Sequence, residues 1–528
     1  MGITMVATTA ENLGVFKYVR IVTGSIVLIT SFFVLTAANA IAADWKLVPS
    51  INLTETYSDN VKLAVNGAEQ SAYITQFSPS FSVTASGQRL KLQANYVMQN
   101  SYYSGINNEA KTNHLLQANA NASLIQDLFF LEGNANITQQ NLSPFGQVVE
   151  NNFNLSNNRA EVKTYSISPY FSSKFNNNFT SELRYVHDSV VSGSLLSSNS
   201  QSDSLRFSLS SGSAFKTVNW GLNYSHQNVH YDNLAPLTTE MTTVSLGYQI
   251  SPLFRLTSTS GYEKNSYVTL GEKPPGYFWT AGFAWAPTQR TNLIFNTGQR
   301  FYGKTHAMTF SHRGRMSVFS VGYNEDVTTT RGQFLIPATN NTSAFLNQLW
   351  QSTIPDATNR QQAVDNFIRD SGLPSALAQP INTFTNQVFL QRGMQGSIAL
   401  SGVQNTIVFN LFNSTREPLS AGLEAAAISG PLSKDRQIGV NALWSWQLSP
   451  RTNTSVNATY TEAKIINTKD STLNGVKNIT KNLRASISRQ LQPKLKATLE
   501  VRHVQTDSTL VFGNYHENAI TLFLFLGF

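Results

Sequence analysis

The chain has 528 residues, a net charge of +8 and no cysteine. Charged residues make up 13% of the chain, about half the usual share, and the mean hydropathy is −0.19. This composition is unusual for a soluble enzyme, but it is typical of a barrel whose strands face lipid on one side and water on the other. The absence of cysteine excludes disulfides and thiol chemistry.

The N-terminus has the pattern of an export signal. Lys17 and Arg20 precede an apolar run at 21–38, and small residues follow at 38–43. This order predicts a signal peptide over 1–43, with a signal anchor as the alternative. After residue 43 no stretch reaches the roughly 18 apolar residues of a spanning helix. A membrane protein without such helices must be a closed β-barrel.

Alternating segments follow in chain order, beginning with 45–56, 72–84 and 89–99. In the third segment Leu90 and Leu92 share one face, and Lys91 and Gln93 share the other, because side chains alternate along a strand. Such a pair of faces suits a wall between lipid and water.

Short and long connections between these segments alternate along the chain. The short ones lie at 85–88, 125–127, 175–178, 213–217, 251–253, 286–289, 313–314, 402–404, 449–451 and 491–493. The long ones lie at 57–71, 142–162, 190–202, 230–240, 416–434, 465–477 and 507–514. We therefore predict an all-β antiparallel transmembrane barrel of about 22 strands, within a range of 20 to 24. Pro79 and Pro169 fall inside predicted strands, where we expect bulges.

The last residues form a closing strand. Ile520, Leu522, Leu524, Leu526 and Phe528 share one face, and the chain ends on that aromatic. This ending predicts insertion into the outer membrane of a Gram-negative bacterium, with both termini periplasmic. The expected partners are outer-membrane lipid and the barrel-assembly machinery, for which Phe528 is the candidate assembly signal. Nucleic acid is not an expected partner.

Residues 334–387 break the two-residue period, and the stretches 344–350 and 360–369 have helical spacing. By strand parity this insert enters from the external side, and so long a connection is usually functional or disordered. Its apolar residues argue against disorder, because they need a surface to pack on. The insert is either a cap on the rim or a lid or plug in the lumen. The candidate gate residues are Phe345, Leu349, Trp350, Phe367 and Ile368.

Charged residues on the polar phase of the strands are the candidate pore lining. They are Lys91, Arg184, Arg206, Arg255, Arg300, Arg484, Lys494, Lys496 and Arg502, with Glu182, Glu263 and Glu500. The excess of basic residues would favour anionic solutes or an acidic polymer. The alternative is that these charges only hydrate and balance the interior.

No catalytic constellation and no metal or cofactor site is predicted. His226 and His230 lie on one face of a strand about 13 Å apart, too far for one metal ion. His187 and Asp188 point to opposite faces. We therefore expect no enzymatic activity, and a rim-sited enzyme is the least favoured of the functional classes.

Two stretches carry a family resemblance. N-Q-V-F-L-Q-R-G-M-Q-G-S-I-A-L-S-G-V-Q-N-T-I-V-F-N-L-F at 386–412, with its V-F-L-x-R and N-T-I motifs, resembles a hairpin of the PEP-CTERM system-associated outer-membrane proteins. The opening W-K-L-V-P-S-I-N-L-T-E-T-Y-S-D-N at 45–60 is similar to the first strand and loop of that family. Gly393 departs from the basic or polar residue expected there.

The resemblance implies an association with exopolysaccharide and protein-sorting gene clusters, and it brings no catalytic residues. The leading hypothesis is therefore a porin-like channel that exports exopolysaccharide or passes anionic solutes. The alternative is a structural sheath or anchor that holds a partner protein or a polymer inside the barrel.

Overall fold

The computed structural model describes most of the chain after residue 42. The described residues are 43–106, 109–194, 199–232, 234–267, 276–335, 346–347, 350, 360, 364, 380–381, 383–420, 433–467, 474–510 and 513–528. The predicted signal peptide therefore lies outside them, except for its last residue. None of the described helical residues belongs to a helix long and apolar enough to cross a membrane.

Twenty-two strands form one antiparallel sheet. The first eleven are β1 (Asp44–Ser58), β2 (Ala72–Ser86), β3 (Leu90–Ser104), β4 (Ala110–Ile125), β5 (Phe129–Asn141), β6 (Arg159–Phe175), β7 (Phe179–Ser192), β8 (Ser200–Ser211), β9 (Val218–Tyr231), β10 (Leu237–Ser251) and β11 (Phe254–Asn265). The others are β12 (Tyr277–Thr288), β13 (Thr291–Arg300), β14 (Gly303–Arg313), β15 (Ser317–Thr329), β16 (Val388–Ser401), β17 (Asn405–Pro418), β18 (Lys434–Ser449), β19 (Thr452–Asn467), β20 (Lys477–Gln492), β21 (Leu495–Ser508) and β22 (Tyr515–Gly527). The helix α2 (Thr330–Leu335) follows β15.

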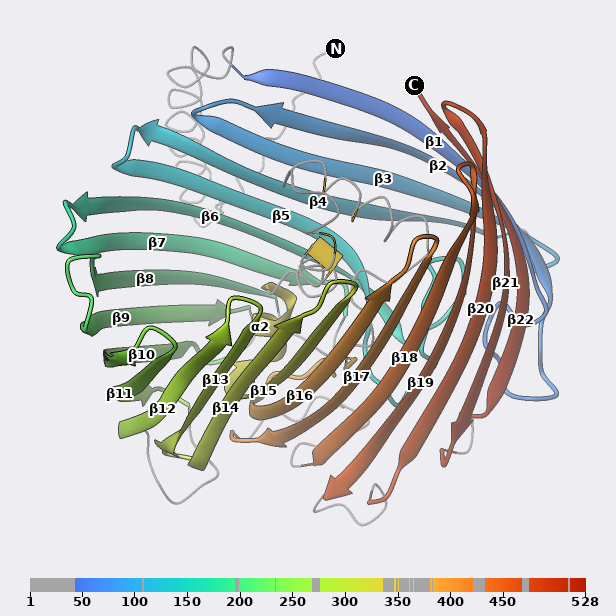
Figure 1. Ribbon diagram of the computed structural model, residues 1–528. Helices are drawn as coiled ribbons and strands as arrows, with labels where there is room; N and C mark the ends of the chain where they lie inside the picture. The colour runs from blue at the N-terminus through green and yellow to red at the C-terminus, as the bar shows by residue number, and fades with distance from the viewer. Residues whose placement is uncertain are drawn as a thin grey trace, which may run out of the picture.

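The sheet closes on itself, because β1 pairs with β22 as well as with β2. Figure 1 shows this seam, with the blue β1 beside the red β22. The seam ladder covers only the second half of β1, from Ser50 to Ser58, whereas the ladder to β2 covers all of that strand. The predicted closed barrel of 22 strands is confirmed, and so is the long connection that follows the fifteenth strand.

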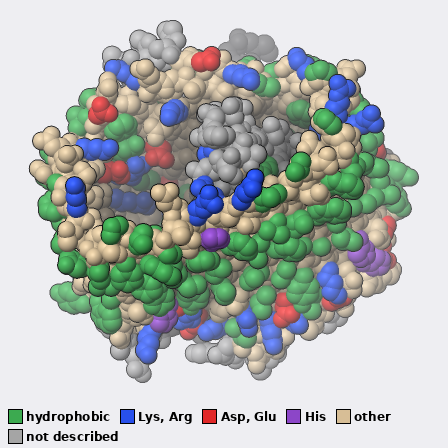
Figure 2. Space-filling model, viewed as in Figure 1, with side chains coloured by type: hydrophobic (Ala, Val, Ile, Leu, Met, Phe, Trp, Pro, Cys, Tyr) green, Lys and Arg blue, Asp and Glu red, His purple; other side chains and the backbone are tan. Residues whose placement is uncertain are grey.

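The two faces of the wall differ in chemistry, as the alternation predicts. On β22 the side chains of Ile520, Leu522 and Leu526 are exposed on the outside, while Ala519 and Thr521 are buried on the inside. Figure 2 shows the hydrophobic side chains gathered in a broad belt over the outer wall, with charged residues at the rim and in the hollow of the barrel. Stacked Trp444 and Trp446 on β18, with centroids 5.8 Å apart, belong to this outer face.

All ten predicted short connections lie at the end of the barrel where β1 begins and β22 ends, which we call the turn end; the opposite end is the loop end. The loop end has a short connection as well, the two residues 301–302 between β13 and β14. Asp127 and Asn176 occupy the left-handed region in two of these tight turns, with φ of 58° and 50°. Asp and Asn tolerate this conformation better than other residues with a Cβ atom do.

The predicted bulges at Pro79 and Pro169 are absent. Next to each proline one ladder loses pairs, but its register is the same before and after the gap. A proline without an N–H therefore costs pairing on one side and inserts no extra residue. Register shifts lie instead mostly near the turn end, as between Gln249 and Ser251 on β10.

Candidate functional site

The lumen holds a cavity of about 880 Å³, lined from one side by β3–β5 and from the other by β15–β20. Side-chain amides are the most frequent polar groups in its lining. They include Asn95, Gln117, Asn136, Gln140, Asn324, Gln391, Gln395, Asn441, Asn457, Asn478 and Asn482. Each amide offers both donors and an acceptor, so this wall can form hydrogen bonds with a solute without selecting its charge.

The structure places most predicted pore-lining residues on the inward face of their strands. Lys91, Arg206, Arg255 and Lys496 are at least partly open to the lumen. Lys494 differs from the prediction, because it lies in the turn between β20 and β21 rather than on a strand. The remaining predicted residues belong to ion pairs.

Inward ion pairs neutralise four of the nine predicted basic residues: Arg184, Arg300, Arg484 and Arg502. Arg184 contacts Glu182 at 2.8 Å and Glu132 at 2.7 Å. Arg300 pairs with Glu263, which lies 37 residues away in the sequence. The basic excess that predicted an anion channel is therefore compensated in part within the wall.

The same compensation operates near the seam. Arg484 lies 3.5 Å from both Glu500 and Glu150, and Arg502 lies 2.7 Å from Glu517. The side chains of Arg502 and Glu517 are each only 1% exposed. Among the ion pairs of the described residues, none involves Arg206.

The long connection 142–158 between β5 and β6 folds into the lumen; we call it the seam loop. It lies against the inner wall of β19–β22 and β1–β3. Phe145 packs with Ala463 and Ile465 of β19, and Val149 packs with Val504 and Tyr515. The seam loop therefore occupies the part of the lumen next to the seam, at the loop end.

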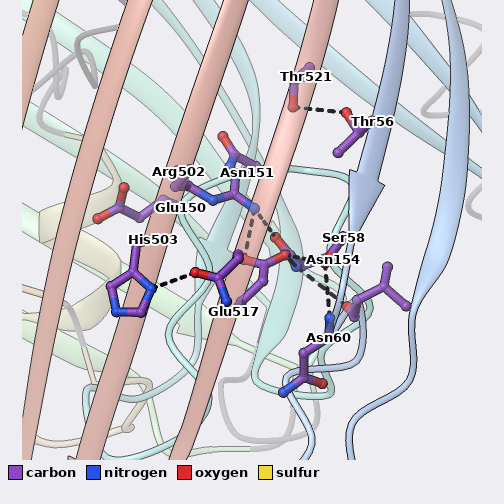
Figure 3. A network of polar contacts seen from close by, with 12 residues as sticks. Thr56, Ser58, Asn60, Glu150, Asn151, Asn154, Arg502, His503, Glu517 and Thr521 are labelled. Atoms are coloured by element: carbon purple, nitrogen blue, oxygen red, sulfur yellow. Dashed lines mark hydrogen bonds and ion pairs between the residues drawn. The ribbon is translucent and has the colours of Figure 1, made fainter.

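A polar network fastens the seam loop to both strands of the seam (Figure 3). The Glu517 carboxylate of β22 accepts hydrogen bonds from Ser58 of β1 at 2.6 Å and from Asn154 of the loop at 2.7 Å. The Arg502 guanidinium lies 4.8 Å from the centre of the Phe153 ring. The Tyr103 hydroxyl donates a hydrogen bond of 2.7 Å to the backbone carbonyl of Phe153. The network therefore joins three distant segments of the chain at the point where the barrel closes.

A second set of segments crosses the lumen at the loop end. This strap consists of α2 and residues 380–387, of which 382 is not described, and Figure 1 shows α2 inside the ring of strands. Arg331 of α2 reaches the far wall, where it pairs with Asp188 of β7 and donates to Ser200 of β8 at 2.9 Å. Both charged side chains are buried, at 5% and 6% exposure.

The second half of the strap, residues 380–387, also contacts both sides of the lumen. Phe384 is fully buried among Ala160, Val162 and Val190 and stacks edge-on with Phe334 at 4.8 Å. Ile381 exchanges two hydrogen bonds of 2.8 Å with the Gln437 amide of β18. Together with the Arg331–Asp188 ion pair, these contacts tie opposite sides of the barrel together.

The insert also contacts the wall on the turn-end side of the strap. Four inward residues are direct neighbours across β15–β18 and form one apolar row: Val318, Ala399, Val408 and Leu443. Leu346 and Val364 of the insert pack on this row with no exposed surface, and Trp350 packs beside them. At least part of the insert therefore lies inside the barrel, so a cap confined to the rim is wrong.

Of the candidate gate residues, only Trp350 can be placed. Phe345, Leu349, Phe367 and Ile368 lie outside the described residues. The neighbouring Leu346 and Val364 carry the contact, and sequence reasoning missed them. A signal existed in the wall, since Val318, Val408 and Leu443 are apolar on a phase that is elsewhere mostly polar.

No group of three or more His, Asp or Glu side chains in the described part of the chain could hold a metal ion. The His187 ring lies 2.9 Å from Asp203, and this pair is on the outer face of β7 and β8. The described barrel interior is a polar, hydrogen-bonding wall with two inward-folded segments.

The comparisons with known proteins concern the fold. No family model matches the sequence, and no curated protein matches it. Among solved structures, the chain is similar to the FrpB iron transporter from Neisseria meningitidis (F5-1 variant), with a TM-score of 0.50, 10% identity, and coverage of 91% of this chain and 82% of that one. The siderophore receptor PirA from Pseudomonas aeruginosa matches with a TM-score of 0.46 and 11% identity over 92% and 80% of the two chains. The outer membrane protein opdK of the same organism matches with a TM-score of 0.35 and 8% identity over 92% and 99%. At this identity the FrpB likeness shows that the chain has the fold of a large transmembrane β-barrel.

Proposed function

We propose that the protein is an outer-membrane channel for a polar polymer, most simply an exopolysaccharide on its way out of the cell. The amide-lined cavity between β3–β5 and β15–β20 carries this proposal. Sugar hydroxyls both donate and accept hydrogen bonds, so they match the amides of this wall. Both termini would then face the periplasm, and the loop end would face outward.

Charge pairing in the lumen favours a neutral or weakly charged polymer over anionic solutes. Selectivity for anions needs a field from uncompensated cations. Arg184, Arg300 and Arg502 each have a carboxylate within ion-pair distance. The open cations Lys91, Arg206, Arg255 and Lys496 do not line the amide-rich cavity.

The alternative of a sheath around a partner protein is less favoured, because segments of the chain itself occupy the lumen. At the loop end the seam loop covers the inner wall near the seam, and the strap crosses the interior. We propose that the insert acts as a gate, seated through Leu346 and Val364 on the apolar row. The resemblance to PEP-CTERM system-associated proteins supports the polymer as cargo.

The test is single-channel conductance of the purified protein in planar bilayers, compared with a variant that lacks residues 336–379. The deletion keeps both halves of the strap, so it removes the insert with little change to the wall. We expect low conductance from the intact protein and higher conductance from the deletion. Neutral dextran added to one side should block the open channel, whereas dextran sulfate of the same length should block it no better.

The matched cellular test measures polysaccharide outside and inside cells that lack the protein. Accumulation inside the cells, with rescue by the intact gene, supports polymer export. Unchanged export would overturn the assignment of the cargo, and a deletion variant that does not conduct would overturn the channel itself. A partner protein that copurifies in equal amounts with a non-conducting barrel would favour the sheath.

A further inference from the structure

A row of cations crosses the outer face of the barrel at the loop end. The cross-strand registers place Arg392 of β16 opposite Thr415, Thr415 opposite Arg436 of β18, Arg436 opposite Lys464 of β19, and Lys464 opposite Lys477 of β20. Directly opposed residues have Cβ atoms about 5 Å apart, and like charges at such positions destabilise a sheet. Arg436, Lys464 and Lys477 are therefore three neighbouring cations that need a counter-charge.

The closest ion pairs of the row lie at its two edges. Arg392 contacts Glu417 at 2.7 Å, and Lys477 contacts Glu462 at 3.0 Å. In the middle, Arg436 donates to the neutral amide of Asn413 at 3.0 Å. Lys464 is exposed, and neither it nor Arg436 belongs to an ion pair among the described residues. The nearest carboxylate, Glu462, lies two residues from Lys464 on the same face and attracts it, but Lys477 already binds this carboxylate. The row therefore carries more positive charge than its carboxylates neutralise.

The row lies where lipid headgroups would lie. The outward side chains of β18 from Ile438 to Leu448 are apolar except for Trp444 and Trp446 ring nitrogens. At about 3.3 Å per residue and a strand tilt of roughly 40°, this stretch spans about 25 Å, the height of the apolar band of such barrels. Arg436 is the next outward residue beyond that band. A cation there faces the headgroups of the leaflet at the loop end.

We propose that Arg436, Lys464 and Lys477 bind the phosphate groups of a phosphorylated glycolipid of the outer leaflet, of the lipid A type. Two phosphates on a disaccharide can bridge cations on adjacent strands, and the acyl chains then lie along the apolar band below. Basic residues near an anionic membrane surface contribute about 1 kcal/mol each. This site depends on the outer-membrane location and not on the identity of the transported polymer.

The test is native mass spectrometry of the full-length barrel in detergent, titrated with bis-phosphorylated lipid A and with the same lipid after dephosphorylation. We expect the phosphorylated lipid to bind and the dephosphorylated lipid to bind far more weakly. The variant R436Q/K464Q should raise the Kd for lipid A by about 25-fold, or about fivefold per charge removed. Added salt should weaken binding to the intact protein, because exposed charges are screened.

Two controls separate this site from general effects. Lys163 is also an outward lysine near the loop end, but its cross-strand neighbours are Ile137 and Val191 and it pairs with Glu161 at 3.0 Å. K163Q should leave the Kd unchanged. R436K/K464R keeps both charges and should keep the affinity, so a loss caused by misfolding would be recognised.

Equal binding of the two lipids to the intact protein would overturn the proposal, and so would an unchanged Kd in R436Q/K464Q. Loss of lipid binding with normal bilayer conductance and dextran block would leave the channel function intact. The failure of one proposal is therefore distinguishable from the failure of the other.

Discussion

The lumen is filled from two sides by segments that are held in different ways. The seam loop is held by buried polar contacts, with Asn154 bonded to Glu517 and Phe153 lying under Arg502. The described insert residues Leu346 and Val364 are held by apolar packing on the row from Val318 to Leu443. The two seats lie on adjacent parts of the inner wall, β15–β18 for the insert and β19–β22 with β1–β3 for the seam loop.

The difference between the seats indicates which segment can move. Removing the seam loop would leave Arg502 and Glu517 without their bonds to Asn154, and buried polar groups are costly to leave unpaired. Releasing Leu346 and Val364 would only expose apolar surface, at about 25 cal/mol per Å². We infer that the seam loop is a permanent part of the wall and that the insert is the releasable part.

Among the described residues, the strap is held by a buried ion pair, much as the seam loop is held by buried polar contacts, and it should give the largest effect on stability. Arg331→Leu leaves the Asp188 carboxylate buried without its partner, which costs about 3–5 kcal/mol. Denaturant titration of the barrel in detergent would measure the loss. The double variant R331L/D188L should recover most of it, because no buried charge is stranded. A single variant as stable as the parent would show that the strap is not an anchor.

The next largest effect is expected from a substitution in the contact between the insert and the apolar row. Leu346→Ala removes a fully buried side chain and should weaken the seat by about 2–4 kcal/mol. A loss of 2 kcal/mol shifts the ratio of seated to released insert by roughly thirtyfold, which appears as a higher open probability in bilayers. Leu346→Met conserves volume and should change the open probability little. If both variants gate like the parent protein, the row is not the seat of a gate.

A substitution in the seam loop should lower the unfolding free energy of the barrel without changing its conductance. Asn154→Leu removes the hydrogen bond to Glu517 and should cost about 1–3 kcal/mol of unfolding free energy. Conductance should remain at the parent value, because Phe145 and Val149 still hold the loop. Asn119→Leu, at an exposed position of β4, is the matched control and should change stability by less than about 0.5 kcal/mol. An increase in conductance in Asn154→Leu would contradict the permanent role of this loop.

The smallest effect is expected at an open lumen cation. Arg206 is exposed on the inward face of β8, so Arg206→Gln should change stability by less than about 0.5 kcal/mol. The reversal potential in a salt gradient should shift slightly toward cations, because one open positive charge is lost. Arg184→Gln is the comparison, since it strands Glu132 and Glu182 and should also destabilise the wall. A large loss of anion permeability in Arg206→Gln would revive the anion-channel hypothesis.

Local patterns predicted the wall but not its contents. The strand count, the ten short turns and the outward face of β22 follow from a two-residue period that each strand carries by itself. The Arg300–Glu263 pair and the Arg502–Glu517 pair could not be read in this way, because each joins different strands. Glu517 was absent from the predicted lining although it lies on the inward phase of the closing strand.

The sequence by itself determined the barrel, since alternation and turn chemistry are local and each strand records its own two faces. It also marked residues 334–387 as the exception, because their apolar spacing is helical. Only the tertiary structure decided which lumen charges pair and which connection binds both strands of the seam. It also decided that Leu346 and Val364 pack on the inner wall. The reason is physical: the apolar row takes one residue from each of four strands, and those residues become neighbours only through cross-strand register.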